Sequence, residues 1–291
     1  MTSDDVIIKK TDKTDAVLLF SDTAVYKIFT TKIVDKGVLD DLIRLDKLSN
    51  RHPVCTGITA IADTPFIKED VDSNSLVIVM RRLPDDGCLL KLISQDAFGS
   101  DGVKRLASFI YEFHTKTLVI DAKKSYLWDR LQSDLDMVKP LVGASPIVYR
   151  FYLDTLSLLE ANKSQVLERP KLHRIVEGHG DLNLGHLYLE DETFCFIDFS
   201  HKRKYRIDDV SRDLGGVALS MIENDRYDFA CELIKEYAAI SADEALQSIT
   251  ALQMRKKLLL NYYIYSGGYS PEHCARESVE KIISTITNWK L

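Results

Sequence analysis

The spacing of apolar residues changes near residue 80, and this change narrows the folds open to the chain. Before it, short β-branched and aromatic runs alternate with clusters of Thr, Asp, Lys and Ser, which is typical of strands and turns. Beyond it, apolar residues recur at helical spacing, as Val103, Leu106 and Ile110 illustrate. The sequence therefore predicts an α+β protein, with a small antiparallel sheet followed by a larger and mainly helical part.

The expected elements can be placed along the chain by these patterns. Strand-like runs lie at 6–10, 16–20, 24–29, 56–61 and 75–80, and one helical pattern at about 38–49 interrupts them. Further helical patterns lie at about 103–116, 125–140, 146–166, 208–223, 226–240, 243–266 and 271–288. Residues 172–199 form a non-helical island with strand-like runs at 187–189 and 193–198. Because Pro, Gly and charged residues fill 81–87, we expect a hinge there, between domains 1–80 and 88–291.

Composition and charge exclude several classes of protein. With 291 residues, 45% hydrophobic and 28% charged, the chain is long enough for one large domain or two lobes, and its composition is not that of a disordered chain. The formal net charge of −6 argues against a general binder of nucleic-acid backbones, so nucleic acid is not an expected partner. Apolar runs stay below the roughly 18 residues of a spanning helix, and the first ten residues lack a signal-peptide pattern. Five scattered cysteines without CxxC spacing suggest reduced thiols, so we expect a cytoplasmic protein without a membrane partner.

One stretch, residues 177–213, carries the residue types of a chemical site. Two glycines flank His179 and permit a tight turn, and Asp181 follows directly. His186 precedes the first strand-like run and Asp198 ends the second, so we expect these side chains and Asp181 at one end of a hairpin. Two carboxylates in such a place suit phosphoryl transfer, in which one accepts a proton and the other holds Mg²⁺. The same pattern also describes an ordinary hairpin with solvated acids.

Two segments of this stretch resemble a known family of kinases. HGDLNLGHLYL (179–189) and FCFIDF (194–199) are similar to the catalytic loop and metal-binding strand of the aminoglycoside phosphotransferase and choline kinase superfamily, where the pattern is about H-G-D-x-x-x-x-N followed by a strand ending I-D. VMRRLPDDGCLLKLI (79–93) and YRIDDVSRDLGGVALSM (205–221) resemble an uncharacterised bacterial branch of that superfamily. The resemblance covers about 16–240. It implies a bilobal protein-kinase-like fold that uses ATP, or another nucleoside triphosphate, with Mg²⁺ or Mn²⁺.

The resemblance also assigns roles to residues of the island. Asp181 would be the catalytic base that orients the acceptor hydroxyl, and Asp198 the aspartate that chelates the metal. His179, Asp209 and Asp213 would brace the loop or cap the helix that follows it.

In the first part of the chain, the resemblance points to a nucleotide-binding lobe. Lys27 lies on the third expected strand, where these kinases place the lysine that pairs with the α- and β-phosphates. Its acidic partner would be Asp41, chosen over Asp40 and Asp46 because the expected helix has no glutamate. Met80 and Arg82 lie in the segment 80–83, at the start of the hinge, whose backbone would face the adenine edge. The turn between the first two strands has no glycine-rich sequence, which argues against a protein kinase.

His186 departs from the pattern, because most of the superfamily has Asn at this metal-site position. Imidazole nitrogen suits Mg²⁺ poorly and Mn²⁺ or Zn²⁺ better. Three interpretations stay open: His186 positions phosphate or a metal-bound water, it ligates a softer metal, or the second metal site is lost. Asn183 is a further candidate oxygen ligand.

The sequence indicates less about the phosphoryl acceptor than about the nucleotide donor. Acids gather in 222–245, which suits a cationic acceptor, whereas HKRKYR at 201–206 suits an anionic one, and both runs also fit ordinary solvated surfaces. We expect an ATP-dependent phosphotransferase that acts on a hydroxyl of a small-molecule acceptor. The alternative is a catalytically inactive pseudokinase that binds nucleotide or a partner, and metal-assisted hydrolysis is a third, weaker interpretation because HExxH-type spacing is absent.

Overall fold

In the computed structural model the chain forms two compact units, each assembled from two stretches of sequence. The first unit comprises 1–95 and 185–202, and the second comprises 96–184 and 203–291. The structure describes residues 7–9, 16–21, 23–29, 35–60, 76–266, 279–284 and 286. Compared with the expected domains, 88–95 and 185–202 group with the first unit. Within the described residues, no helix combines the length and apolarity that a membrane crossing requires.

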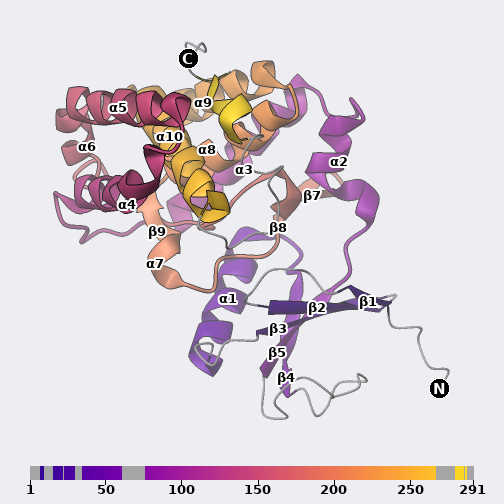
Figure 1. Ribbon diagram of the computed structural model, residues 1–291. Helices are drawn as coiled ribbons and strands as arrows, with labels where there is room; N and C mark the ends of the chain where they lie inside the picture. The colour runs from indigo at the N-terminus through magenta and orange to yellow at the C-terminus, as the bar shows by residue number, and fades with distance from the viewer. Residues whose placement is uncertain are drawn as a thin grey trace, which may run out of the picture. The chain divides into compact units, whose positions relative to one another are not determined.

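The first unit is built on a five-stranded antiparallel sheet (Figure 1). Its strands are β1 (Ile7–Lys9), β2 (Ala16–Phe20), β3 (Ala24–Phe29), β4 (Cys55–Ala60) and β5 (Leu76–Arg81), in the spatial order β1-β2-β3-β5-β4. β3 is therefore a central strand, and its register places Lys27 opposite Leu18 on β2 and Ile78 on β5. The expected small antiparallel sheet is confirmed, and Lys27 lies in its middle.

One helix, α1 (Lys36–Ser49), packs beside this sheet and contacts β4. Asp35 caps its first turn, since Asp35 Oδ1 accepts a hydrogen bond of 3.0 Å from the backbone N–H of Val38. The leucines of one face, at helical spacing, are buried: Leu39, Leu42 and Leu45. The helix ends at Ser49, and Asn50 follows as its C-cap residue, with its backbone N–H donating to Asp46 O.

The first unit also contains a short helical segment and a hairpin. These are η2 (Asp85–Gly87), α2 (Leu89–Ser94), β7 (Leu187–Glu190) and β8 (Thr193–Phe196), and η3 (Leu184–His186) leads into the hairpin. Arg81 at the end of β5 binds Glu190 of β7 through two hydrogen bonds of 2.6 Å. This bidentate contact joins the end of the sheet to the hairpin.

The second unit is mainly helical. Its helices are α3 (Ser100–Lys116), α4 (Tyr126–Val142), α5 (Pro146–Ala161), α6 (Lys163–Glu168), α7 (Arg203–Arg206), α8 (Ser211–Glu223), α9 (Tyr227–Ser241) and α10 (Leu246–Ser266), and a two-stranded ribbon joins β6 (Ile175–Glu177) to β9 (Ile207–Asp209). α10 contacts α4, α5, α8 and α9, and Figure 1 shows it among them. α8 is buried at nearly every position from Ser211 to Ile222, as expected for a helix enclosed by others.

A buried cation holds three parts of this unit together. The side chain of Arg169, after α6, is fully buried. Its guanidinium donates to Asp209 at the end of β9, at 2.6 and 2.9 Å. It also donates to both oxygens of Asp243, before α10, at 2.7 Å. One charge thus satisfies two buried carboxylates, each of which would otherwise be costly to bury.

Candidate functional site

A pocket with about 350 Å³ of empty space, part of it open to solvent, lies within the first unit. Its lining is mostly apolar and comes from α1, the sheet, and the segment after β8: Leu42, Val54, Cys55, Ile78, Met80, Ile197 and Phe199. Three charged residues also line it, namely Lys27, Asp46 and Asp198. A mostly apolar wall with a few converging polar groups is the usual character of a small-ligand site.

Lys27 and Asp198 form an ion pair in this pocket. The ammonium of Lys27 contacts Asp198 Oδ1, and the Lys27 side chain is only 12% exposed. The same ammonium lies 5.0 Å from the ring centroid of Phe29. A largely buried lysine needs an anionic partner, so the expectation that Lys27 faces an anion agrees with this contact. The partner here is Asp198, the residue expected to hold a metal.

The expected partner of Lys27 on the helix, Asp41, makes a different contact. Its Oδ1 accepts from Arg44 at 2.6 Å on the exposed side of α1. The pairing of Lys27 with Asp41 stays a prediction. Among the acids of α1, Asp46 instead lines the pocket with Lys27.

Asp46 is bonded to the backbone at the start of β4. Asp46 Oδ1 accepts from Val54 N–H at 3.2 Å, and Oδ2 accepts from Cys55 N–H at 2.9 Å. Burial raises the pKa of Asp46, although these hydrogen bonds oppose the shift. Burial also raises the pKa of the Cys55 thiol to about 12, so this pocket residue is neutral at physiological pH.

Asn50, the residue that follows α1, connects this helix to the hairpin. Its amide N–H donates to Phe196 O at 2.9 Å and its Oδ1 accepts from Phe196 N–H at 2.8 Å. Asn50 also donates to Asp46 Oδ1 at 2.7 Å. Because Phe196 precedes Asp198 by two residues, this clamp positions the strand that carries Asp198. No local pattern in the sequence signals such a long-range contact.

Asp198 and His186 lie at the open end of the β7–β8 hairpin. Asp198 has φ 61°, in the left-handed region that a non-glycine residue enters at a cost. The imidazole Nε2 of His186 lies 3.6 Å from Asp198 Oδ2. The backbone N–H of Ile197 donates to His186 O at 3.0 Å, which fixes the two chain segments against each other. The structure thus brings Asp198, His186 and Lys27 together.

The two hinge residues have different surroundings. Met80 lines the pocket and lies opposite Val25 of β3. The backbone N–H of Arg82 donates to Thr23 O, and its guanidinium donates to Ser21 O, both at 3.0 Å. Arg82 therefore ties β5 to the turn before β3. A contact of Met80 or Arg82 with adenine stays a prediction.

In the second unit, the turn that presents Asp181 is braced by Asp213, as expected. Asp213 Oδ2 accepts from His179 N–H at 2.7 Å and Oδ1 accepts from Gly180 N–H at 3.2 Å. A Cβ on Gly178 would lie 2.4 Å from Asp213 Oδ2, and Gly180 has φ 84°. Both glycines are therefore required for this close approach and this backbone conformation.

The bracing carboxylate is buried and stays ionised. Burial on its own raises the pKa of Asp213, but His114 and His179 outweigh burial, and the pKa lies below its ordinary value. His114 Nε2 lies 3.3 Å from Asp213 Oδ2, and His114 Nδ1 lies 2.8 Å from the Tyr237 hydroxyl. His179 is fully buried beside this carboxylate. The expected structural role of His179 and Asp213 is therefore confirmed.

Asp181 itself faces outward from its unit. Its side chain is 54% exposed, and Lys257 Nζ of α10 lies 3.7 Å from its Oδ1. Asn183 donates through its side-chain amide to Asp181 O at 3.2 Å, so it supports the turn. The turn thus presents an accessible carboxylate on a rigid frame, which is what a general base needs.

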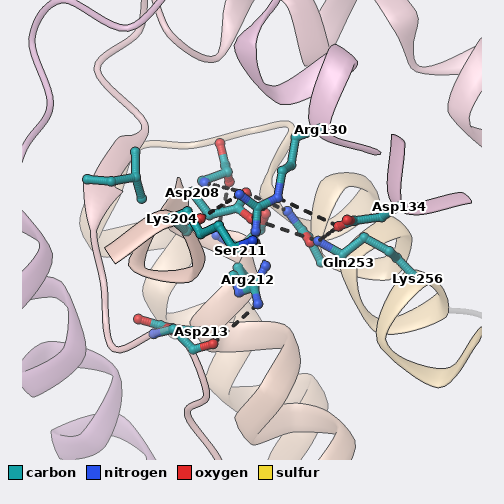
Figure 2. A network of polar contacts seen from close by, with 12 residues as sticks. Arg130, Asp134, Lys204, Asp208, Ser211, Arg212, Asp213, Gln253 and Lys256 are labelled. Atoms are coloured by element: carbon teal, nitrogen blue, oxygen red, sulfur yellow. Dashed lines mark hydrogen bonds and ion pairs between the residues drawn. The ribbon is translucent and has the colours of Figure 1, made fainter. Parts of the chain in front are cut away.

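A buried network supports the same turn from the other side (Figure 2). Arg212 donates to Gly180 O at 3.2 Å and to Asp208 Oδ2 at 3.0 Å. Further members from α4 and α10 surround Asp208: Arg130 at 3.8 Å, Lys256 at 3.8 Å and Gln253 at 3.2 Å, and Asp134 lies 3.2 Å from Lys256. The backbone next to Asp181 is therefore connected to three helices through Arg212.

The charges of this network predict a pH-dependent stability. Burial alone would raise the pKa of Asp208, but the cations Lys256, Arg212 and Arg130 outweigh it and lower the pKa to about 2. Because the folded pKa lies below the ordinary 3.8, ionised Asp208 stabilises the fold above that value, and this stability is lost as pH falls toward about 2. Urea unfolding between pH 2 and 7 should show the loss, and Asp208→Asn should flatten it while lowering stability at pH 7. Equal slopes for the variant and the wild type would assign the acid sensitivity to other groups, and Asp191→Asn, on an exposed turn, is the matched control.

Several residues of the acidic run 222–245 and the basic run 201–206 form ion pairs within the second unit. From the acidic run, Asp243 is buried against Arg169, and Asp228 Oδ2 accepts from Arg226 at 3.2 Å. From the basic run, Arg206 is buried and donates to Glu177 at 3.1 Å. These pairings weaken both charge arguments, and the charge of the acceptor stays open.

The two candidate metal ligands at the hairpin, Asp198 and His186, are of different chemical kinds. The Asp198 carboxylate is a suitable oxygen ligand for Mg²⁺, but the His186 nitrogen is not. In the part of the chain that the structure describes, no group of three or more His, Cys, Asp or Glu side chains converges as a metal site. A divalent ion here would need further ligands from a nucleotide or from water.

Comparisons with known proteins place the chain by its structure. No protein-family model and no curated protein matches it. A choline/ethanolamine kinase family protein from Mesorhizobium loti is similar, with 12% identity, a TM-score of 0.65 and coverage of 98% of this chain and 88% of that chain. A spectinomycin phosphotransferase in complex with ADP and spectinomycin has 12% identity, a TM-score of 0.58 and coverage of 98% and 89%. A glucosamine kinase in complex with glucosamine, ADP and inorganic phosphate has 11% identity, a TM-score of 0.58 and coverage of 97% and 79%.

These similarities cover nearly the whole chain at low sequence identity, so they establish the fold. The resemblance to the bacterial branch rests on the sequence segments alone. The chain therefore has a mixed helix and sheet fold of the kinase-like kind seen in the choline/ethanolamine kinase family protein, the spectinomycin phosphotransferase and the glucosamine kinase.

Proposed function

We propose that this protein transfers the γ-phosphoryl group of ATP, or of another nucleoside triphosphate, to a hydroxyl of a small-molecule acceptor. The observation that carries the proposal is the pair of Lys27 and Asp198 in a mostly apolar pocket of the first unit. An apolar wall suits a nucleobase, and a buried ammonium suits phosphate oxygens. The domain roles follow: 1–80 binds nucleotide, 81–87 is the hinge, and 88–291 supplies the catalytic turn.

Each residue has a defined task in this proposal. The acceptor hydroxyl oxygen forms a bond to the γ-phosphorus while the bond from that phosphorus to the bridging oxygen breaks, and the nucleoside diphosphate leaves with the electron pair. The carboxylate of Asp181 accepts the hydroxyl proton, and Lys27 pairs with phosphate oxygens. In this type of transfer, positioning and electrostatic stabilisation supply most of the rate. The braces through Asp213 and Arg212 hold the backbone of the turn for that purpose.

The similar structures support a small-molecule acceptor. Two of them are complexes in which ADP accompanies a small molecule, spectinomycin in one and glucosamine in the other. We propose that the acceptor here is likewise small and carries a hydroxyl. A metabolite extract incubated with ATP, analysed for any compound phosphorylated by the wild type and not by Asp181→Asn, would identify it.

A pseudokinase is the second candidate, and one observation favours it. His186, whose Nε2 lies 3.6 Å from Asp198 Oδ2, occupies the position where the resemblance leads us to expect Asn. A protein that binds nucleotide without transfer would keep the pocket and lose only turnover. Asp181-dependent turnover therefore separates the two candidates.

Nucleotide binding can be tested without knowing the acceptor. A ligand at 100 times its Kd adds about 2.7 kcal/mol to the free energy of unfolding, so ATP with a divalent ion should raise the melting temperature clearly. Lys27→Met should reduce this shift, because the phosphates lose their buried cation. Lys91→Met, on the exposed face of α2, is the matched control and should leave the shift unchanged. An equal ATP-induced rise in melting temperature in the wild type and both variants would show that Lys27 does not contribute to nucleotide binding.

A further inference from the structure

Lys257 of α10 lies beside the proposed base Asp181, within the second unit. Its Nζ is 3.7 Å from Asp181 Oδ1. The side chain of Lys257 is 29% exposed and that of Asp181 is 54% exposed, so both are accessible to an acceptor. Because exposed ion pairs contribute little to stability, the effect of Lys257 is expected on the orientation of the base and not on folding.

Buried contacts next to Lys257 hold α10 in place. Lys256, the preceding residue, is buried, and its Nζ lies 3.8 Å from Asp208 Oδ2. Gln253, one turn earlier, donates to Asp208 Oδ1 at 3.2 Å (Figure 2). The register of α10 is therefore fixed, and Lys257 reaches Asp181 from a rigid helix.

A close approach of α8 holds the backbone of the turn that carries the base. A Cβ at Gly216 of α8 would overlap Leu182 O and would lie 3.2 Å from Lys257 Nζ. Glycine is therefore required at this position, because any side chain would displace the turn or the ammonium. Leu182 directly follows Asp181, so α8 fixes the backbone at the base and leaves room for Lys257.

Glu223, at the end of α8, is a second carboxylate within the electrostatic range of Lys257. Partial burial raises the pKa of Glu223, and the charge of Lys257 opposes this rise. The ammonium thus interacts with two acids, Asp181 and Glu223. The attraction of both keeps it beside the turn.

We propose that Lys257 is a positioning residue, whose ammonium holds Asp181 Oδ1 so that Oδ2 is oriented toward the acceptor hydroxyl. This inference rests on the proposed function. The contacts of the turn fix its backbone, whereas the carboxylate still rotates about its own side-chain bonds, and a cation at one oxygen restricts this rotation. A general base must lie within hydrogen-bond reach of the proton that it accepts. A misdirected carboxylate therefore lowers the rate without weakening the binding of either substrate.

The experiment compares Lys257→Met with Lys257→Arg and with the control Lys235→Met, which changes an exposed lysine of α9. With the acceptor found in the extract, kcat of Lys257→Met should fall about tenfold to 100-fold, while KM for the acceptor and for ATP should change by less than about twofold. Lys257→Arg keeps the cation and should recover much of the lost kcat. The control should match the wild type. The melting temperature, and its rise with ATP and a divalent ion, should be alike in all four proteins.

Crystal structures of the wild type and Lys257→Met supply a readout that needs no acceptor. The Asp181 carboxylate should have one orientation in the wild type, next to Lys257, and more than one in the variant. A single, unchanged orientation in the variant would contradict the positioning role.

The kinetic outcomes separate this inference from the proposed function. Full kcat in Lys257→Met overturns the inference and leaves the proposed function intact. A raised KM for the acceptor at unchanged kcat also overturns it, because Lys257 would then bind the acceptor instead of orienting the base. If the wild type phosphorylates no compound of the extract in an Asp181-dependent manner, the proposed function and this inference fail together. A lowered kcat at unchanged KM, recovered in Lys257→Arg, supports the positioning role.

Discussion

Asp181→Asn is expected to lower kcat of phosphoryl transfer by about 10² to 10⁴-fold, the usual contribution of a positioned general base. Asparagine keeps the shape of the side chain but accepts no proton at neutral pH. Because the Asp181 side chain is half-exposed and the turn is held by backbone contacts to Asp213 and Arg212, folding should change little. The measurement is steady-state turnover with the acceptor found in the extract, together with the ATP-induced melting shift.

The matched control is Asp191→Asn, which changes an exposed acid in the turn between β7 and β8. Asp191 has φ 45°, a conformation that asparagine tolerates. The control should retain both turnover and the melting shift. Full activity in Asp181→Asn would contradict the assigned role, and a lost melting shift would place Asp181 in nucleotide binding instead.

Arg169→Met is expected to destabilise the protein by about 3–5 kcal/mol, a large part of the stability of an ordinary domain. The substitution removes the cation that pairs with buried Asp209 and Asp243, and among the described residues it leaves Asp243 with only Arg174, whose Nε lies 3.5 Å from Asp243 Oδ2. Urea unfolding at pH 7 measures the loss. If the variant is too unstable to purify, Arg169→Lys retains one charge and allows an intermediate loss to be measured.

Two further variants test whether the lost charge of Arg169 causes the destabilisation. Lys171→Met, two residues away and exposed, should change stability by less than about 0.5 kcal/mol. Adding Asp209→Asn to Arg169→Met should restore part of the lost stability, because this buried carboxylate no longer carries a charge after its cation is removed. A double variant less stable than Arg169→Met alone would mean that packing of the arginine stem matters more than its charge.

The sequence predicted most of the long elements because their apolar residues are strictly periodic. α1, α3 and the strands β2 and β3 lie within a few residues of their predicted bounds. α2 was missed because six residues carry too little periodicity to separate a short helix from an extended run. The pattern at 146–166 is divided at Asn162 into α5 and α6.

Two other differences have tertiary causes. The pattern at 208–223 begins as a helix only at Ser211, because 207–209 pair with β6 from a distant part of the chain. Pairing of this kind depends on partners that local periodicity does not reveal. The expected helix at 271–288 lies mostly outside the described residues.

For the site, motif residues were easier to predict than their supports. The H-G-D turn and the strand before Asp198 carry a local signature, and the brace from Asp213 follows from the same family pattern. Asn50, Asp46 and Arg212 act through contacts to residues 8 to 146 positions away, which no local pattern encodes. The choice of Asp41 rested on the lack of a glutamate in the expected helix.

The amide of Asn50 gives α1 an uncharged connection to the hairpin. A two-stranded ribbon is marginal by itself in water, and here a side chain supplies the donor and the acceptor that a third strand would offer to Phe196. Such a bond does not depend on ionic strength as a surface ion pair does. The contact between the end of α1 and the hairpin should therefore be insensitive to salt. Any displacement of α1 would break the two hydrogen bonds to Phe196 that hold the strand leading to Asp198.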